Sequence, residues 1–145
     1  MTIESIDLWH TRARPQPTEE DFAVQLGCHF EEIAEMLDVL AFDFDTAHIS
    51  SEAHSYIKLL ADRLKGGKGK VKIQDRKEFL DSIADQVVTA VGAAHCAGMD
   101  GAEAVARVNT SNWSKFDDDG MPIFNEQGKI KKGPNYKPPV LDRLY

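Results

Sequence analysis

The sequence predicts an all-α protein of about five helices that ends in an irregular tail rich in glycine and proline. Apolar residues recur at helical spacing in several long segments, and capping signals precede most of these segments. No helical period continues beyond about residue 112. The chain has 145 residues, of which 42% are hydrophobic, so it is long enough for one domain with a core.

The first three helices are expected at 4–13, 19–44 and 46–64. The segment Arg14-Pro15-Gln16-Pro17 reads as a linker between the first two. Thr18, with Asp21 three residues later, matches the capping box that begins a helix. The glycine-rich run from Lys65 to Lys70 then ends the helical pattern.

The last two helices are expected at 75–97 and 100–112. Each starts with an aspartate followed three residues later by a glutamate, the same kind of N-terminal signal. Gly98 follows the longer helix and is a typical helix stop. In the tail, a small β-hairpin is expected around residues 123–130. We therefore expect a helical domain over 1–117 and a tail over 118–145.

Composition restricts the classes of function. Acidic residues number 24 and basic residues 17, so the net charge is −7. This balance argues against nucleic-acid binding, although a bound metal would still permit a phosphate ligand. No apolar run approaches the roughly 20 residues of a membrane span, and the N-terminal segment lacks a secretory pattern. We expect a cytoplasmic protein with two buried, reduced thiols at Cys28 and Cys96.

Carboxylates on the helix expected at 19–44 fall on two different faces. At about 100° per residue, Glu31 and Asp38 share a polar stripe. Glu32 and Glu35 instead flank Val39 on a largely apolar surface, which is unusual for a solvated charged face. Glu32 and Glu35 are therefore candidates for a function other than solubility.

The helix expected at 75–97 carries the second pair of carboxylates. Valine, isoleucine and alanine surround it almost completely, which predicts a buried, central helix. Asp81 and Asp85 share a narrow face with Gly92, and Glu78 lies close to that face. Acids in a buried helix need partners or a metal, and Gly92 would let a neighbouring helix or a ligand approach.

Two helices bearing such pairs would direct several carboxylates at one point and would require a cation there. The cation suited to an all-oxygen site is Mg²⁺, or Mn²⁺, and the ligand that such a cation usually binds is a polyphosphate.

Three other functional motifs that the sequence partly resembles are incomplete. The lysine- and glycine-rich run lacks P-loop order, Lys115 occupies the first ligand position of the EF-hand-like stretch, and no glutamate precedes a histidine by three residues as in di-iron bundles.

Three segments, taken in their order along the sequence, resemble a known protein family. The first is Glu31 to Leu37, and the second runs from Asp81 through Gly92 to Asp100. The third begins at Ser111-Asn112-Trp113-Ser114-Lys115-Phe116 and continues through Gly120-Met121-Pro122-Ile123 to Lys132-Gly133-Pro134-Asn135-Tyr136. In this order they resemble the MazG-like all-α nucleoside triphosphate pyrophosphohydrolases, and most closely the phage-type, phosphoribosyl-ATP pyrophosphohydrolase-like members.

The resemblance implies an antiparallel helical bundle that works as a homodimer or a dimer of dimers. It implies Mg²⁺-dependent hydrolysis of a nucleoside triphosphate, for this chain a deoxy- or noncanonical one, to the monophosphate and pyrophosphate. The implied metal ligands are Glu32, Glu35 and Asp85, with Glu31 as an accessory carboxylate. Any of the three glutamates could activate the attacking water.

This chain departs from the family pattern at one ligand. A glutamate usually stands three residues before the helix aspartate, where this sequence has Ser82. Asp81 is the expected substitute, and Glu78 is a second candidate. Other assignments remain open as well, since a non-catalytic helical module that binds nucleotide or protein, or a phosphoribosyl-ATP pyrophosphohydrolase, would also account for the pattern.

The resemblance also implies which residues contact the triphosphate. Asn109, Asn112 and Lys115, at the end of the last helix, should face the phosphates. His10 is a secondary candidate for stacking on the base, although ordinary packing is the better explanation for this residue. The tail is expected to pack on the same domain or on a neighbouring subunit.

Overall fold

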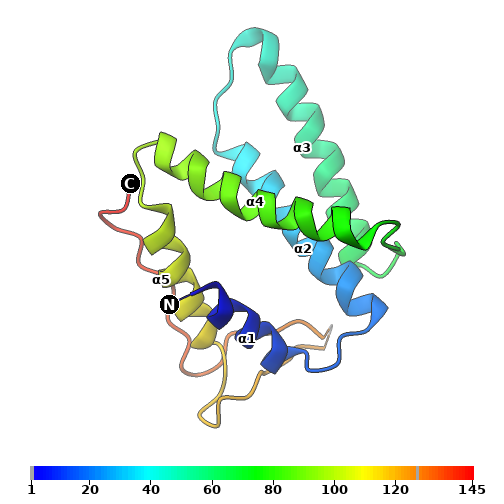
Figure 1. Cartoon of the computed structure of the whole chain (residues 1–145), viewed down its shortest axis with the longest axis vertical. Coiled ribbons are helices and arrows are strands. Elements are labelled where there is room, and N and C mark those ends of the chain that lie inside the picture. The colour runs from blue at the N-terminus through cyan, green and yellow to red at the C-terminus, as the bar shows by residue number, and fades with distance from the viewer. Residues whose placement is uncertain (1, 127) are drawn as a thin grey trace. The chain divides into compact units, whose positions relative to one another are not determined.

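A computed structural model describes residues 2–126 and 128–145. It contains five helices, and no strand occurs within these ranges (Figure 1). The prediction of an all-α protein is therefore confirmed. The helices are α1 (Ile3–Ala13), α2 (Glu19–Asp38), α3 (Phe44–Lys65), α4 (Arg76–Cys96) and α5 (Gly101–Trp113).

The chain divides into two compact units. One unit comprises residues 17–74 and contains α2 and α3. The other comprises residues 1–16 and 75–145, so it contains α1, α4, α5 and the tail. The boundaries fall at the proline-rich linker and just before the cap of α4, and each unit is described by itself below.

The helix starts follow the capping signals in the sequence. The Thr18 side chain accepts a hydrogen bond from the Asp21 backbone N–H at 3.1 Å, and the Asp21 carboxylate accepts one from the Thr18 backbone N–H at 2.9 Å, which completes the capping box. Asp75 and Asp100 cap α4 and α5. Gly98, with φ of 78°, ends α4 as predicted, because only glycine adopts this left-handed conformation without strain.

The end of α2 is where the predicted boundary was wrong. The helix expected to reach residue 44 ends at Asp38. Asp43 then begins α3, because its side chain accepts a hydrogen bond from the Thr46 backbone N–H at 2.9 Å.

Replacing Asp43 with alanine should lower the free energy of unfolding, because the orphan N–H of Thr46 loses its acceptor. Urea unfolding followed by circular dichroism measures the change. Ser51→Ala, an exposed position within α3, is the matched control and should cause no comparable loss. Equal stability of the two variants would contradict the capping role.

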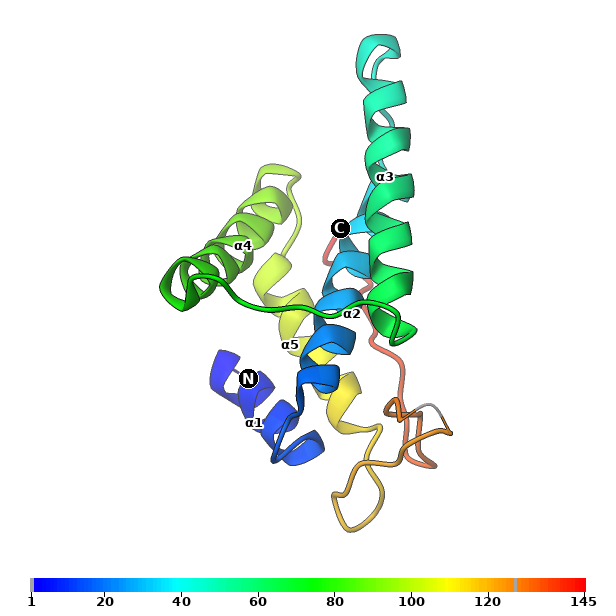
Figure 2. The same cartoon turned by 90° about the vertical axis from the view of Figure 1, so that its right-hand side faces the viewer.

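Helices α2 and α3 pack as a close antiparallel pair (Figure 2). Small residues permit the close approach: Gly27 and Ala34 of α2 are buried, as is Ala61 of α3. A Cβ at Gly27 would lie 2.9 Å from the backbone oxygen of Ala61 and 3.0 Å from Leu64 Cβ. The core of this unit is therefore a seam of small side chains completed by Leu64.

Aromatic side chains form the core of the other unit. Trp9 and Ala13 of α1 pack with Phe116, which follows α5, and all three are buried. The rings of Trp9 and Phe116 stack with centroids 5.5 Å apart, while Trp113 and Ile130 pack against this cluster. Ordinary packing therefore accounts for Trp9, and Ile130 brings the tail into the core.

The tail lies along α5 and is held mainly through its backbone. Ser111 Oγ donates a hydrogen bond to the Lys137 carbonyl at 2.7 Å, and Arg107 donates one to the Val140 carbonyl at 2.9 Å. Near the end of the chain, the Asp100 N–H donates to the Leu144 carbonyl at 2.9 Å. The expected hairpin consists of a single antiparallel bridge between Phe124 and Ile130.

Two predictions of burial were wrong. Helix α4 was expected to be buried, yet it has no buried side chain, and Val88 is 69% exposed. Among the described helices of its own unit, α4 packs only against α5, which leaves most of its apolar surface uncovered. The thiols were also expected to be buried, but Cys28 is half-buried and Cys96 is exposed.

Among the described helices, none combines the length and the apolarity that a membrane span requires.

Candidate functional site

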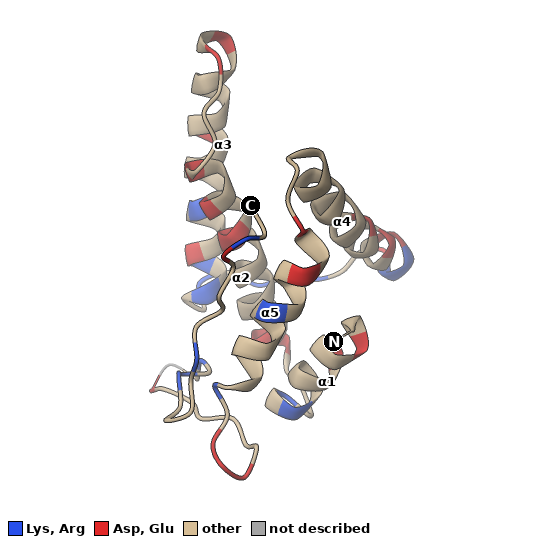
Figure 3. Cartoon of the chain, turned by 90° about the vertical axis from the view of Figure 1, so that its left-hand side faces the viewer, with Lys and Arg blue, Asp and Glu red and all other residues tan. Residues whose placement is uncertain are grey.

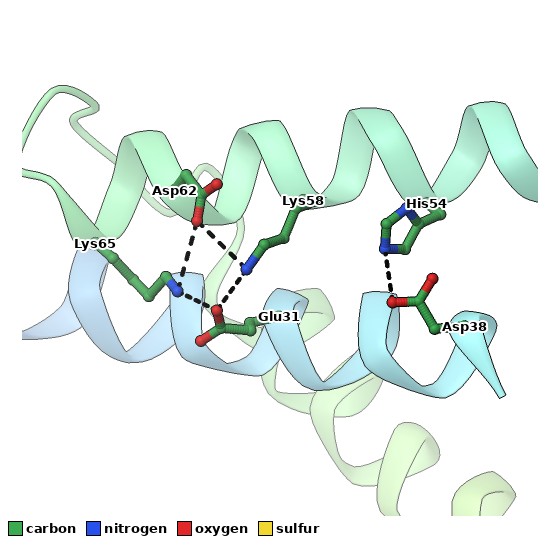
Figure 4. Close-up of polar contacts among 6 residues, drawn as sticks. All are labelled: Glu31, Asp38, His54, Lys58, Asp62 and Lys65. Carbon is green, nitrogen blue, oxygen red and sulfur yellow. Dashed lines mark hydrogen bonds and ion pairs between the residues drawn. The ribbon is translucent and has the colours of Figure 1, made fainter.

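Glu31 lies at the centre of an ion-pair cluster between α2 and α3 (Figure 4). Lys58 Nζ lies 2.7 Å from Glu31 Oε1, and Lys65 Nζ contacts the same oxygen. Asp62 completes the cluster, 3.6 Å from each ammonium. The Lys65 side chain is only 10% exposed, so its charge depends on these two carboxylates for compensation.

The two lysines set the protonation state of Glu31. Hydrogen bonds from Lys58 and then Lys65 lower the pKa of Glu31 from its ordinary 4.5 to about 2. The same contact with Glu31 raises the pKa of Lys58. Glu31 is therefore an ionised carboxylate whose charge is already balanced, which suits it to hold a structure in place rather than to exchange protons.

Replacing Glu31 with glutamine should lower stability at neutral pH by about 1–2 kcal/mol, because it leaves two ammonium groups short of a partner. A carboxyl with a lowered folded-state pKa stabilises the protein above its unfolded pKa. Its contribution is lost as the pH falls from 4.5 towards about 2. The variant should therefore show a flatter loss of stability over this range.

Urea unfolding across that pH range measures the difference between the variant and the wild type. Glu52→Gln is a matched control, because Glu52 is exposed on α3 and takes part in no ion pair within the described residues. Parallel pH profiles for wild type and Glu31→Gln would contradict the role given to the cluster.

A second ion pair joins the same two helices. His54 Nε2 lies 3.2 Å from Asp38 Oδ2 (Figure 4). Glu31 and Asp38 were predicted to share a polar stripe, and both side chains do pair with α3. The sequence reasoning missed their partners, although Lys58 and Lys65 stand seven residues apart, a spacing that places two side chains on one helix face.

Glu32 and Glu35 behave differently from Glu31. Both are exposed, and neither has an ion-pair partner within the described ranges. They stand three residues apart, so their side chains are neighbours on the helix surface. Met36 and Val39 beside them are 52% and 82% exposed, so these two acids lie on the partly apolar surface that the helical phase predicted.

On α4, Asp81 and Asp85 are likewise exposed, with no ion pair recorded over residues 2–126 and 128–145. Because both carboxylates are exposed to solvent, burial does not require them to bind a metal. Glu78 lies in the first turn, where its backbone N–H donates a hydrogen bond to the Asp75 cap at 3.0 Å. Ser82 offers its carbonyl to Gln86 within the helix.

Within the described residues, no three His, Cys, Asp or Glu side chains gather closely enough to hold a metal ion. The predicted ligand set takes Glu32 and Glu35 from one unit and Asp81 and Asp85 from the other. Neither unit alone therefore carries the complete set, and the metal site remains a prediction.

The predicted phosphate-contacting residues separate into two groups. Lys115 Nζ donates a hydrogen bond to Asn112 Oδ1 at 2.7 Å, so these two side chains lie together at the end of α5. Asn109 is instead buried, and its amide donates to Ser5 Oγ of α1 at 3.2 Å. Asn112 and Lys115 thus form one polar group, whereas Asn109 joins α5 to α1.

His10 is half-buried beside Trp9, with the two rings edge to face and their centroids 4.9 Å apart. Burial lowers the pKa of His10, and the charge of Asp7 partly opposes this effect. The imidazole is therefore neutral at physiological pH and packs on the aromatic core of its unit.

Comparisons with known protein families, curated proteins and solved structures find no match to this chain. The resemblance described above therefore rests on the residues quoted for it and remains a prediction.

Proposed function

We propose that this protein is a metal-dependent pyrophosphohydrolase acting on nucleoside triphosphates, deoxy- or noncanonical ones in particular. The observation that supports this most directly is the contrast among the three glutamates of α2. Glu31 is neutralised by two lysines, whereas Glu32 and Glu35 are exposed and have no ion-pair partner among the described residues. Adjacent carboxylates left without cations are the groups that a divalent metal would neutralise.

The donor chemistry fits Mg²⁺ or Mn²⁺. The proposed ligands are carboxylates without exception: Glu32, Glu35, Asp81 and Asp85, with Glu78 as the alternative fourth ligand. Hard divalent cations prefer such oxygen ligands, whereas zinc or copper would favour histidine or cysteine. When bound, the metal would supply Lewis-acid polarisation of the phosphate oxygens.

Side chains of the protein would bind the phosphates and orient the attacking water. The ammonium of Lys115 and the amide of Asn112 offer donors for phosphate oxygens, and their own hydrogen bond holds them together. Glu32 or Glu35 would orient the attacking water through a free carboxylate oxygen. Glu31 is assigned a positioning role, because displacing its two lysines would leave the largely buried Lys65 without adequate compensation.

The uncovered apolar surface of α4 supports the proposed homodimer or dimer of dimers. Leu80 and Val88 are each 69% exposed, and Val87 is 46% exposed. Such side chains on one helix would be covered in a subunit interface of a symmetric oligomer.

Product analysis tests the proposed reaction. The protein is incubated with individual ribo- and deoxynucleoside triphosphates and Mg²⁺, and the products are separated by anion exchange. Monophosphate plus pyrophosphate, abolished by a chelator, is the expected result. Diphosphate plus orthophosphate would contradict the proposed reaction. Retention of intact nucleotide would favour the non-catalytic binding module instead.

A further inference from the structure

The ammonium of Lys115 is only partly neutralised by its surroundings. Lys115 is half-buried, and its one recorded side-chain hydrogen bond goes to the neutral amide oxygen of Asn112. No carboxylate forms an ion pair with it within residues 2–126 and 128–145. A half-buried ammonium with a neutral partner has donors left for an anion.

The tail brings a second lysine to the same end of α5. The backbone N–H of Gly133 donates a hydrogen bond to the Lys115 carbonyl at 3.1 Å. This approach requires glycine, since a Cβ at position 133 would lie 2.6 Å from that carbonyl oxygen. The main chain at Lys132, the residue before Gly133, therefore lies next to the main chain at Lys115.

The side chain of Lys132 rests on an aromatic ring. Its Nζ lies 4.6 Å from the centroid of Tyr136. The turn that allows this contact is closed by a hydrogen bond from the Tyr136 N–H to the Gly133 carbonyl at 3.2 Å. Lys132 is thus exposed but partly ordered, and it has no carboxylate partner in the described structure.

The tail segment around these residues is purely basic. Between Glu126 and Asp142 the sequence contains four lysines and no acidic residue, in a chain whose net charge is −7. Figure 3 shows blue segments recurring along this tail, while red marks the loop that follows α5. A basic segment in an acidic chain creates a local positive potential, which favours an anionic ligand over a cationic one.

We propose that Lys132 joins Lys115 and Asn112 in one anion site that binds the phosphate chain of a nucleoside triphosphate. The identity of the ligand rests on the proposed function, whereas the site itself rests on the contacts above. Ammonium groups are compact point charges suited to phosphate oxygens. The acidic chain as a whole disfavours a long nucleic acid as the ligand.

The test uses inorganic tripolyphosphate, which carries the same phosphate chain without a nucleoside. Isothermal titration with the full chain, in the presence of Mg²⁺, should detect binding to the wild type. Lys132→Gln should weaken binding about tenfold, and Lys132→Arg should largely restore it. Lys129→Gln removes the same charge from the same tail and is the matched control, with an affinity within about twofold of wild type.

A second variant moves Lys132 without changing any charge. Gly133→Ala forces the tail away from the Lys115 carbonyl and should weaken tripolyphosphate binding as Lys132→Gln does. Circular dichroism of each variant verifies that the helices are retained. In the hydrolysis assay, Lys132→Gln should raise KM and leave kcat nearly unchanged, because a binding contact is lost.

The outcomes separate this inference from the proposed function. Tripolyphosphate binding that depends on Lys132, without nucleotide hydrolysis, would support the anion site and contradict the enzymatic role. Hydrolysis that is equally efficient in Lys132→Gln and Lys129→Gln would overturn the anion site alone. Failure of the wild type to bind tripolyphosphate would also overturn it.

Discussion

Glu35→Gln is expected to reduce nucleotide turnover on the order of 100-fold or more while the fold remains intact. The substitution keeps the shape of the side chain but removes the negative charge that would bind the metal. Glu35 is exposed and has no ion-pair partner in the described residues, so its replacement should change stability by less than about 0.5 kcal/mol. Asp85→Asn on α4 should have the same two consequences.

The measurement is the steady-state rate of pyrophosphate release with Mg²⁺, combined with thermal unfolding of each variant. Glu52→Gln serves as the control for charge, since it also neutralises an exposed glutamate on a long helix. Full activity of Glu35→Gln and Asp85→Asn would refute the assignment of these ligands. A fall in activity that accompanies a fall in melting temperature would indicate a structural role instead.

Gly27→Ala should destabilise the α2–α3 pair by about 1–3 kcal/mol, the usual cost of overpacking. The added methyl group would lie 2.9 Å from the backbone oxygen of Ala61, which cannot move without shifting α3. The improved helix propensity of alanine offsets about 1 kcal/mol of this cost, so the net loss of stability should be at most about 2 kcal/mol.

Gly92→Ala provides a control with the opposite expected sign. Gly92 lies within α4, and a Cβ there would meet nothing within 4 Å. Alanine should therefore stabilise the protein by about 0.5–1 kcal/mol. Urea unfolding measures the free energy of unfolding of both variants. Equal stability of Gly27→Ala and Gly92→Ala would contradict the close approach of α3 at Gly27. A loss of stability at Gly92 would indicate a partner subunit on this face of α4.

Local signals in the sequence predicted most of the secondary structure, because capping depends on residues close together in the chain. The capping box at Thr18 and the stop at Gly98 are of this kind, and both occur in the structure. The end of α2 was missed because the Asp43 cap was not recognised as a signal that competes with continuation of the helix.

The residues that pack against a helix were harder to predict than the face of the helix on which a residue lies. Helical phase correctly placed Glu31 and Asp38 on one stripe, but it could not identify Lys58, Lys65 and His54 as the side chains opposite. The apolar circumference of α4 was taken as burial, yet periodicity indicates only that a helix has surface to cover and not what covers it.

The predicted phosphate-contacting residues at the end of α5 also show that sequence spacing does not identify contact partners. Asn109, Asn112 and Lys115 follow one another at three-residue spacing, which predicts a shared face. The structure separates Asn109 from the other two because Ser5 of α1 accepts its amide. Sequence spacing could not reveal this partner, nor that the main chain at Gly133 lies next to the main chain at Lys115.

The most direct test of the central proposal, which is that carboxylates of α2 and α4 bind a divalent cation, is a Mn²⁺ titration followed by electron paramagnetic resonance. The wild type should bind Mn²⁺, with Mg²⁺ competing. Glu35→Gln and Asp85→Asn should each weaken binding about tenfold or more, while Glu52→Gln should not change it. Absence of Mn²⁺ binding by the wild type, or unchanged affinity in both ligand variants, would contradict the claim.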